Sequence, residues 1–171
     1  NPAGLKKWLK GVVHEGVTGL MCTTITEKKA VLLKAVKNVA AVRKTNPKGA
    51  AILGIHFEGP YLDMKYKGAQ PPEAIVPCSV TEFEEYQKAA DNLIKIITLA
   101  PEHDPDMALT RYCSTHGVVV SMGHSGATFD EAVIAVGNGA RSITHTYNGM
   151  SPFNHRANGL VGAALRLDNV Y

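Results

Sequence analysis

The sequence is short of cysteine. The three it has, Cys22, Cys78 and Cys113, are far apart and form no Cys-x-x-Cys pair. An odd, scattered set of this kind argues against a disulfide framework and against a thiolate zinc site. It favours a reducing compartment, and we expect a cytoplasmic protein.

Long apolar runs and strong charge are also missing. No stretch approaches the ~20 residues of a membrane-spanning helix, and the opening NPAGLKKWLKG has no signal-peptide core. A formal net charge of +3 is too small and too scattered for a nucleic-acid or membrane surface, so we expect small-molecule partners. Because the chain opens without Met, we expect a trimmed or partial piece of a longer protein.

Alternating strands and helices organise the chain. With 45% hydrophobic residues, 171 residues suffice for one domain, which we expect to span 1–171. Short β-branched runs separated by helical stretches predict parallel βαβ units and the α/β class. The expected strands lie at 17–23, 50–57, 93–99, 117–122 and 140–145.

Helix-start signals fall between these strands. Capping boxes are expected for Thr24 with Glu27, Ser79 with Glu82 and Thr128 with Glu131, and Pro105 is expected to open a helix that runs to about Ser114. The segment CTTITEKK after the first strand lacks the Gly-rich turn that is common in doubly wound sheets.

Polar residues gather where several different strands end. They are His56 and Glu58, Glu102 and His103, His124, and His145 and Asn148. A (β/α)8 barrel collects its active site in this way, from the carboxyl ends of many strands. Because five strands cannot close an eight-stranded barrel, we predict a partial TIM-type barrel whose first and last strands are missing.

Glu58 directly follows the second expected strand and lies two residues after His56, so both side chains project to the same face. In a barrel that face is the interior. A buried carboxylate without a partner costs several kcal/mol or takes up a proton. Glu58 therefore needs a cation, a donor network or a metal, unless it is a solvated strand-end residue.

His124 lies just past the fourth expected strand, and His145 ends the fifth. Glycines flank His124 in SMGHSG, and His145 precedes a long polar loop with no helix between. A lone histidine there is commonly a hydrogen-bonded filler. One carboxylate and two imidazoles from three strand ends, however, form a set that Zn²⁺ accepts with a fourth position left for water. Such a site lowers the pKa of bound water and polarises a carbonyl.

Three stretches together carry a resemblance. GIHFEGPYLDMKYKGAQ, GHSGATFDEA and THTYNGMSPFNHRANGLVGAAL are similar, in this order, to the central part of N-acetylglucosamine-6-phosphate deacetylases of the amidohydrolase superfamily. The resemblance implies a metal-dependent amide hydrolase of carbohydrate metabolism. It would cleave the acetamide of N-acetylglucosamine 6-phosphate, with metal-activated water as nucleophile, in a homodimer.

The resemblance also implies residue roles. Glu58, His124 and His145 match the metal ligands, and the metal would be zinc, as one ion or two. Substrate-binding positions of the family match Ala69, Gln70, Asn148, Gly149 and Arg156. Arg156 matches a phosphate-binding Arg that acts across a dimer interface, and a guanidinium can grip a phosphate through two hydrogen bonds. His56 is expected to orient Glu58 or to pack beneath the metal.

Two departures qualify the match. The family's usual KGAH is KGAQ here, so Gln70 stands where a His commonly polarises the substrate carbonyl. Gln70 can donate an N–H but cannot carry positive charge. The family's catalytic Asp lies beyond the chain end, so we expect this chain alone to be inactive. The alternative interpretation is an inactive fragment or a non-catalytic relative that binds sugar phosphates.

Other tempting side chains are expected to be structural. His14, His103 and His116 fall in helix-end or connecting segments, where solvated or capping roles are common. Ser125 beside His124 forms no nucleophile elbow, because neighbouring side chains at a strand end point apart. His155, next to Arg156, is left open.

Overall fold

Five parallel strands form one sheet, in which they follow one another in chain order. The computed structural model describes residues 1–171. The strands are β1 (Gly19–Thr23), β2 (Ala51–Glu58), β3 (Ile94–Leu99), β4 (Val119–Met122) and β5 (Ala140–Ile143). All five expected strands are therefore present, each with its boundaries within two residues of the prediction.

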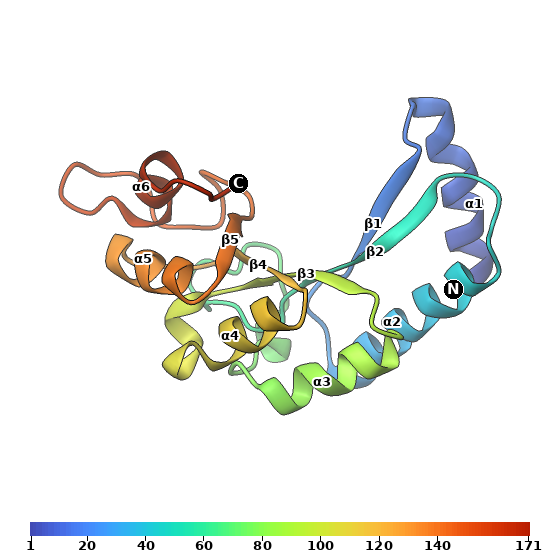
Figure 1. The fold of residues 1–171 in the computed structure, drawn as a ribbon, viewed down its shortest axis with the longest axis horizontal. Helices are drawn as coiled ribbons and strands as arrows, with labels where there is room; N and C mark the ends of the chain where they lie inside the picture. The colour runs from blue at the N-terminus through green and yellow to red at the C-terminus, as the bar shows by residue number, and fades with distance from the viewer.

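Strand order decides between the two common α/β architectures. Each neighbouring pair from β1 to β5 is parallel and joined by a helical crossover. A doubly wound sheet reverses its strand order at a switch point, whereas unbroken chain order is the topology of a (β/α)8 barrel. Figure 1 shows a twisted, open sheet rather than a closed ring. The prediction of a partial barrel is confirmed.

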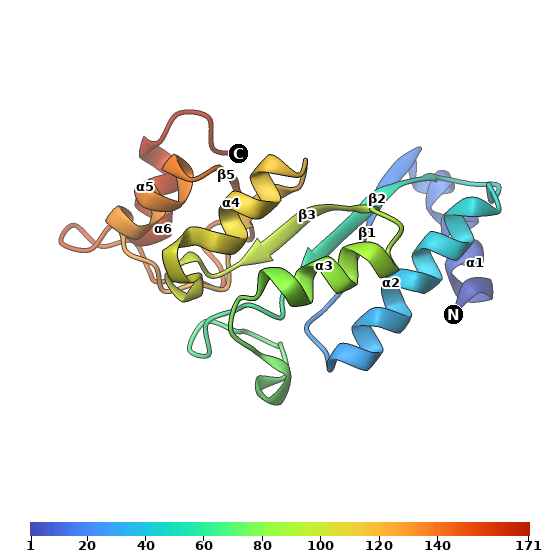
Figure 2. The same ribbon diagram turned by 60° about the horizontal axis from the view of Figure 1, so that its bottom comes forward.

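Six α-helices accompany the sheet, and α2, α3 and α4 lie along one of its faces (Figures 1 and 2). The helices are α1 (Pro2–Val12), α2 (Lys29–Lys44), α3 (Val80–Ala89), α4 (Ala108–Thr115), α5 (Phe129–Gly137) and α6 (Gly159–Arg166). Short 3-10 turns lie at Val13–Glu15, Pro72–Ala74, Pro101–His103 and Pro105–Met107. None of the helices combines the length and the apolar character needed to cross a bilayer.

The helix-covered face of the sheet is apolar. On β2, the Phe57 ring packs against Tyr86 and Phe83 of α3, with centroids 4.8 and 6.2 Å away. All three side chains are fully buried, and burial of each stabilises the fold by roughly 1.5–3 kcal/mol. Because side chains alternate along a strand, Glu58 points away from this packing, toward the face that would line a barrel.

Two of the three predicted capping boxes form wholly or in part. Thr128 and the α5 residue Glu131 make a complete reciprocal box. At α3, Ser79 caps the amide of Glu82, whose carboxylate instead accepts from the Tyr61 hydroxyl. α4 begins three residues after the predicted Pro105, behind a 3-10 turn.

The capping box predicted for Thr24 and Glu27 is wrong. α2 begins at Lys29 with no side-chain cap, and the Thr24 hydroxyl is buried without a hydrogen-bond partner. β1 continues to Thr23, so the segment that follows crosses the carboxyl edge of the sheet before the helix can begin. Helices α1 and α6 were not among the expected elements.

The outer edges of the sheet differ. At β5, the Ile143 amide donates to the Tyr171 carbonyl (2.7 Å) and the Tyr171 amide donates to the Arg141 carbonyl (3.0 Å). These are the contacts of a parallel strand pair. β1 pairs with β2 alone.

Candidate functional site

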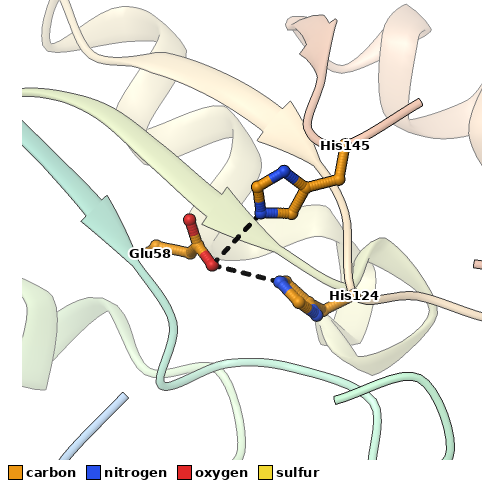
Figure 3. A group of neighbouring side chains, drawn as sticks. All are labelled: Glu58, His124 and His145. Atoms are coloured by element: carbon orange, nitrogen blue, oxygen red, sulfur yellow. Dashed lines mark hydrogen bonds and ion pairs between the residues drawn. The ribbon is translucent and has the colours of Figure 1, made fainter. Parts of the chain in front are cut away.

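The carboxyl edge of the sheet brings the three predicted ligands together. Glu58 is the last residue of β2, while His124 and His145 each lie two residues beyond the ends of β4 and β5. Parallel strands end at one edge of a sheet, so side chains distant in sequence converge there. Figure 3 shows both imidazoles directed at the Glu58 carboxylate.

The geometry of this cluster suits a divalent cation. Glu58 Oε1 lies 3.1 Å from His124 Nε2 and 3.5 Å from His145 Nε2, and the two rings are nearly perpendicular. Tetrahedral ligands with Zn–N bonds of about 2.0–2.1 Å lie about 3.3 Å apart, a spacing between the two observed distances. The predicted convergence is confirmed, while the metal-ligand role of these side chains stays a proposal.

The His124 ring is fixed by its other nitrogen. Nδ1 lies 3.0 Å from the Tyr66 carbonyl, which can only accept, so Nδ1 carries the proton. The neutral ring then directs the Nε2 lone pair at the Glu58 oxygen, and a proton or a cation must lie between them. The hydrogen bond to Glu58 raises the pKa of His124, although burial opposes this. Burial would raise the pKa of Glu58, but its bonds to the two imidazoles lower it overall.

Both histidines of the cluster have unusual backbones, with φ of +48° at His124 and +57° at His145. Non-glycine residues in this left-handed region are uncommon and require support from their surroundings. Glu102 supplies that support near His124, because its carboxylate accepts from the Ser125 hydroxyl and the Gly126 amide, both at 2.6 Å. The sequence marks Glu102 as a strand-end polar residue but assigns it no role.

Gln70 is buried and bonded at both ends of its amide. Its Nε2 donates to Glu58 Oε1 at 2.8 Å, and its Oε1 accepts from the Thr26 amide at 2.8 Å. Only 4% of the residue is exposed. Gln70, which replaces the usual histidine of the KGAH motif, is therefore in direct contact with Glu58, a candidate metal ligand.

His56 lies on the same face as Glu58 but bonds elsewhere. Its Nε2 is 2.7 Å from the Thr98 hydroxyl, from which a chain of hydroxyl contacts runs to Thr144 (2.8 Å) and on to Ser121 (2.7 Å). Burial lowers the pKa of His56, so the neutral ring is favoured. The hydrogen bond to Thr98 gives no direct contact with Glu58, and the expected role of His56 in orienting that carboxylate stays untested.

The remaining predicted substrate-binding residues lie around the cluster. Ala69, Asn148 and Arg156 are exposed. Gly149 has φ of +61°, and a Cβ there would lie 3.1 Å from His124 Nδ1, so a side chain at this position would be strained and would press on the ring. The Arg156 side chain forms no ion pair and borders a hollow of about 470 Å³ beside the first residues of α5 and α6.

The remaining histidines and Ser125 lie outside the cluster of Glu58, His124 and His145. His116 bonds the Tyr112 carbonyl at the end of α4. Nε2 of His103 contacts Asp63 at 2.8 Å, and with Glu102 these side chains form a second group whose ligand atoms lie within 4.8 Å of one another, so the structural role expected for His103 stays a prediction. The Ser125 hydroxyl donates to Glu102 and not to His124, so the two do not form a nucleophile pair. His14 and His155 are exposed.

The curated proteins that are similar to the chain are named as deacetylases of N-acetylated amino-sugar phosphates. It is 43% identical over 160 residues to an N-acetylglucosamine-6-phosphate deacetylase of Bacillus subtilis, covering 91% of the chain and 40% of that protein. It is 33% identical over 164 residues to an N-acetylgalactosamine-6-phosphate deacetylase of Escherichia coli O157:H7, covering 96% and 44%. No family model matches the chain.

Solved structures agree. The N-acetylglucosamine-6-phosphate deacetylase of Thermotoga maritima superposes with a TM-score of 0.86 at 33% identity, over 95% of the chain and 43% of that structure. The chain matches a segment of this deacetylase family. A mutant of the Mycobacterium smegmatis enzyme, solved in complex with N-acetyl-D-glucosamine 6-phosphate, superposes at 0.83 with 30% identity, over 90% and 39%. The chain thus spans about two fifths of the length of the relatives it matches.

Proposed function

We propose that the protein hydrolyses the acetamide of N-acetylglucosamine 6-phosphate, with one water, to glucosamine 6-phosphate and acetate in amino-sugar catabolism. The observation that carries this proposal is the convergence of Glu58, His124 and His145 at the carboxyl edge of a barrel sheet. The names of the similar proteins supply the substrate class.

Zinc is the cation that this ligand set suits best. Two neutral imidazole nitrogens and one carboxylate oxygen are ligands that Zn²⁺ accepts while keeping a position open. When bound, such a cation lowers the pKa of water and polarises the amide carbonyl. The protein's own contribution is to hold the ligands: Tyr66 fixes the His124 ring and Gln70 contacts Glu58.

Substrate recognition is assigned to the loop after β5. Arg156 and Asn148 are exposed there, with no ion pair on the guanidinium, so both are free to contact a sugar phosphate. We assign the 6-phosphate to Arg156 because a guanidinium binds phosphate through paired charge-assisted hydrogen bonds. Its outward position supports a homodimer in which Arg156 reaches the partner subunit's site.

The three cysteines are all free, which supports a reducing compartment, and we place the reaction in the cytoplasm.

Acetate release beside elemental analysis tests the proposal. In the complete protein, His145→Ala should lose bound metal and turnover together, because activation of the water depends on the cation. The matched control is His14→Ala, which removes an exposed histidine outside the cluster and should leave both unchanged. Full activity in metal-free His145→Ala protein would contradict the mechanism. Binding of the sugar phosphate by metal-loaded wild type without acetate release would favour the non-catalytic alternative.

Subunit mixing tests the assignment of Arg156. Arg156→Ala should raise KM for the phosphorylated sugar by ~10–100-fold, because a charged hydrogen-bond partner is worth about 1.5–3 kcal/mol. It should barely change the poor turnover of unphosphorylated N-acetylglucosamine. Mixing it with His145→Ala protein should restore some intact sites in mixed dimers. Equal losses on both sugars would assign Arg156 to folding, and no rescue would place it in its own subunit's site.

A further inference from the structure

We propose that Gln70 is a positioning residue for Glu58, holding the carboxylate oxygen that faces the two histidines, and is not a contact for the substrate carbonyl. The inference rests on the proposed function, since it assigns Glu58 to the metal. It replaces the substrate role that the KGAQ motif suggested with a role in metal binding.

The orientation of the Gln70 amide follows from its partners. The Thr26 backbone amide is a donor, so the atom that meets it must be the carbonyl oxygen of Gln70. Thr26 is fully buried, so its amide is shielded from bulk solvent. The amide nitrogen of Gln70 must then face Glu58, where it donates at 2.8 Å.

The oxygen that Gln70 contacts is the one that matters for a cation. Glu58 Oε1 accepts from Gln70 and also faces His124 Nε2 and His145 Nε2. A carboxylate oxygen has two lone pairs. With one of them held by Gln70, the other is directed to the point shared with the imidazoles.

A single loop fixes two of the three ligands. Residues 66–70 supply the Tyr66 carbonyl to His124 and the Gln70 amide to Glu58. The backbone of this loop is closed by its own hydrogen bonds. The Gln70 backbone N–H donates to the Lys67 backbone carbonyl, and Lys67 Nζ donates to the Gln70 backbone carbonyl. Supporting contacts of this kind tune the affinity of metal sites.

A neutral amide suits this position. A group that could become positively charged 2.8 Å from a ligand oxygen would compete with a cation for that oxygen. Glutamine donates its hydrogen bond without charge at any pH. The departure from histidine at residue 70 is therefore compatible with tight metal binding.

The test measures Zn²⁺ affinity in the complete protein by competition with a chromophoric chelator, in the absence of substrate. Gln70→Met keeps the side-chain length and removes both hydrogen bonds, and we expect the Kd for Zn²⁺ to rise ~10–100-fold. At saturating Zn²⁺, kcat should fall while KM stays within about twofold.

Gln87→Met is the matched control, because Gln87 also bonds through both amide ends, to the Ile94 backbone at 3.0 Å. It should lower thermal stability as Gln70→Met does, yet leave the Kd for Zn²⁺ unchanged. If Gln70→Met does not fold, Gln70→Asn takes its place. The Asn side chain is one methylene too short to bridge Thr26 and Glu58, so this variant should show the same loss of Zn²⁺ affinity.

Wild-type Zn²⁺ affinity in a folded Gln70 variant would overturn the inference, and an accompanying rise in KM would restore the substrate role. If wild type binds Zn²⁺ and releases acetate in that case, only the inference fails. If wild type binds no Zn²⁺ and releases no acetate, the proposed function fails as well.

Discussion

The cluster of Glu58, His124 and His145 has two unlike sides: a buried side that is hydrogen-bonded to the loop 66–70, here called the clamped side, and an exposed side, here called the open side. On the clamped side, Glu58 and His124 are 9% and 6% exposed, and both are bonded to the loop 66–70. On the open side, the His145 side chain is 49% exposed, and its one side-chain hydrogen bond is with Glu58, at 3.5 Å. The exposed loop that carries Arg156 follows it.

This difference shows how the protein divides the task of binding. Under the proposed function, Glu58 and His124 are preorganised by the chain itself, so little ordering would be needed for a cation to bind them. The third ligand and the substrate loop remain accessible, and we expect the cation, the sugar phosphate and a second subunit to order them. Access to the centre is then from the His145 side.

The largest effect is expected from the residue shared by both sides. Glu58→Ala removes the oxygen that faces both imidazoles, so metal retention should be lost and kcat/KM should fall at least about a thousandfold. The measurements are metal content and acetate release. Glu85→Ala, which removes an exposed carboxylate paired with Lys29 on the protein surface, is the control and should keep both. Retained metal in Glu58→Ala would place the ion elsewhere.

A smaller loss of activity is expected when the support of the His124 backbone is removed. Glu102→Ala removes the acceptor of the Ser125 hydroxyl and the Gly126 amide, and so frees the strained turn at His124. Activity should fall about 10–100-fold, and the free energy of unfolding should fall by about 1–3 kcal/mol.

Glu131→Ala is matched to this change, because Glu131 also accepts from one backbone amide and one hydroxyl, both of Thr128. It should lower stability without lowering activity at saturating Zn²⁺. If the two variants lose activity equally, the Glu102 carboxylate has no particular role in holding His124.

Metal removal should act on the two sides differently. With a chelator present, amide hydrogen exchange should speed up roughly tenfold in residues 144–158, because local opening there is opposed by few internal bonds. Exchange in residues 56–62 should change little, since the strand β2 and its hydrogen bonds persist. Hydrogen exchange with mass-spectrometric detection measures both segments at once. Equal protection loss would show that the cation, and not the chain, organises the clamped side.

The smallest effect concerns the stability of the open side. Arg156→Ala should change the free energy of unfolding by less than about 0.5 kcal/mol, because its exposed side chain has no hydrogen-bond partner within the chain. Thermal or denaturant unfolding measures this. A larger loss would mean that Arg156 holds its own loop, and its effect on KM would then have a structural cause.

The strands and the convergence of Glu58, His124 and His145 could be predicted because their signals are local. Each of the three residues lies at or just after the end of a β-branched run, and parallel strands place such ends together. α1 also had a signal, since Leu5, Trp8, Leu9 and Val12 recur at helical spacing. α6 was hidden because Gly159 and Gly162 weaken its helix propensity, which burial of the intervening apolar residues overrides.

The supporting contacts could not be predicted, because they join segments far apart in the chain. Tyr66 acts through its backbone carbonyl, which any residue would offer, and it meets a ring 58 positions away. Glu102 reaches the turn at His124 only because β3 and β4 are neighbours. For Gln70, the motif indicated proximity to the site, but the direction of its amide depends on Thr26, 44 positions earlier.

The two outer strands have a consequence for the behaviour of the chain in isolation. β5 meets Tyr171 on its outer side, whereas β1 pairs only with β2 and leaves a row of N–H and C=O groups open along Gly19–Thr23. An uncovered edge of this kind is a template for another strand. Expressed alone, the chain is therefore expected to self-associate through β1, and a strand that covers this edge would act as a solubility device as much as a structural one.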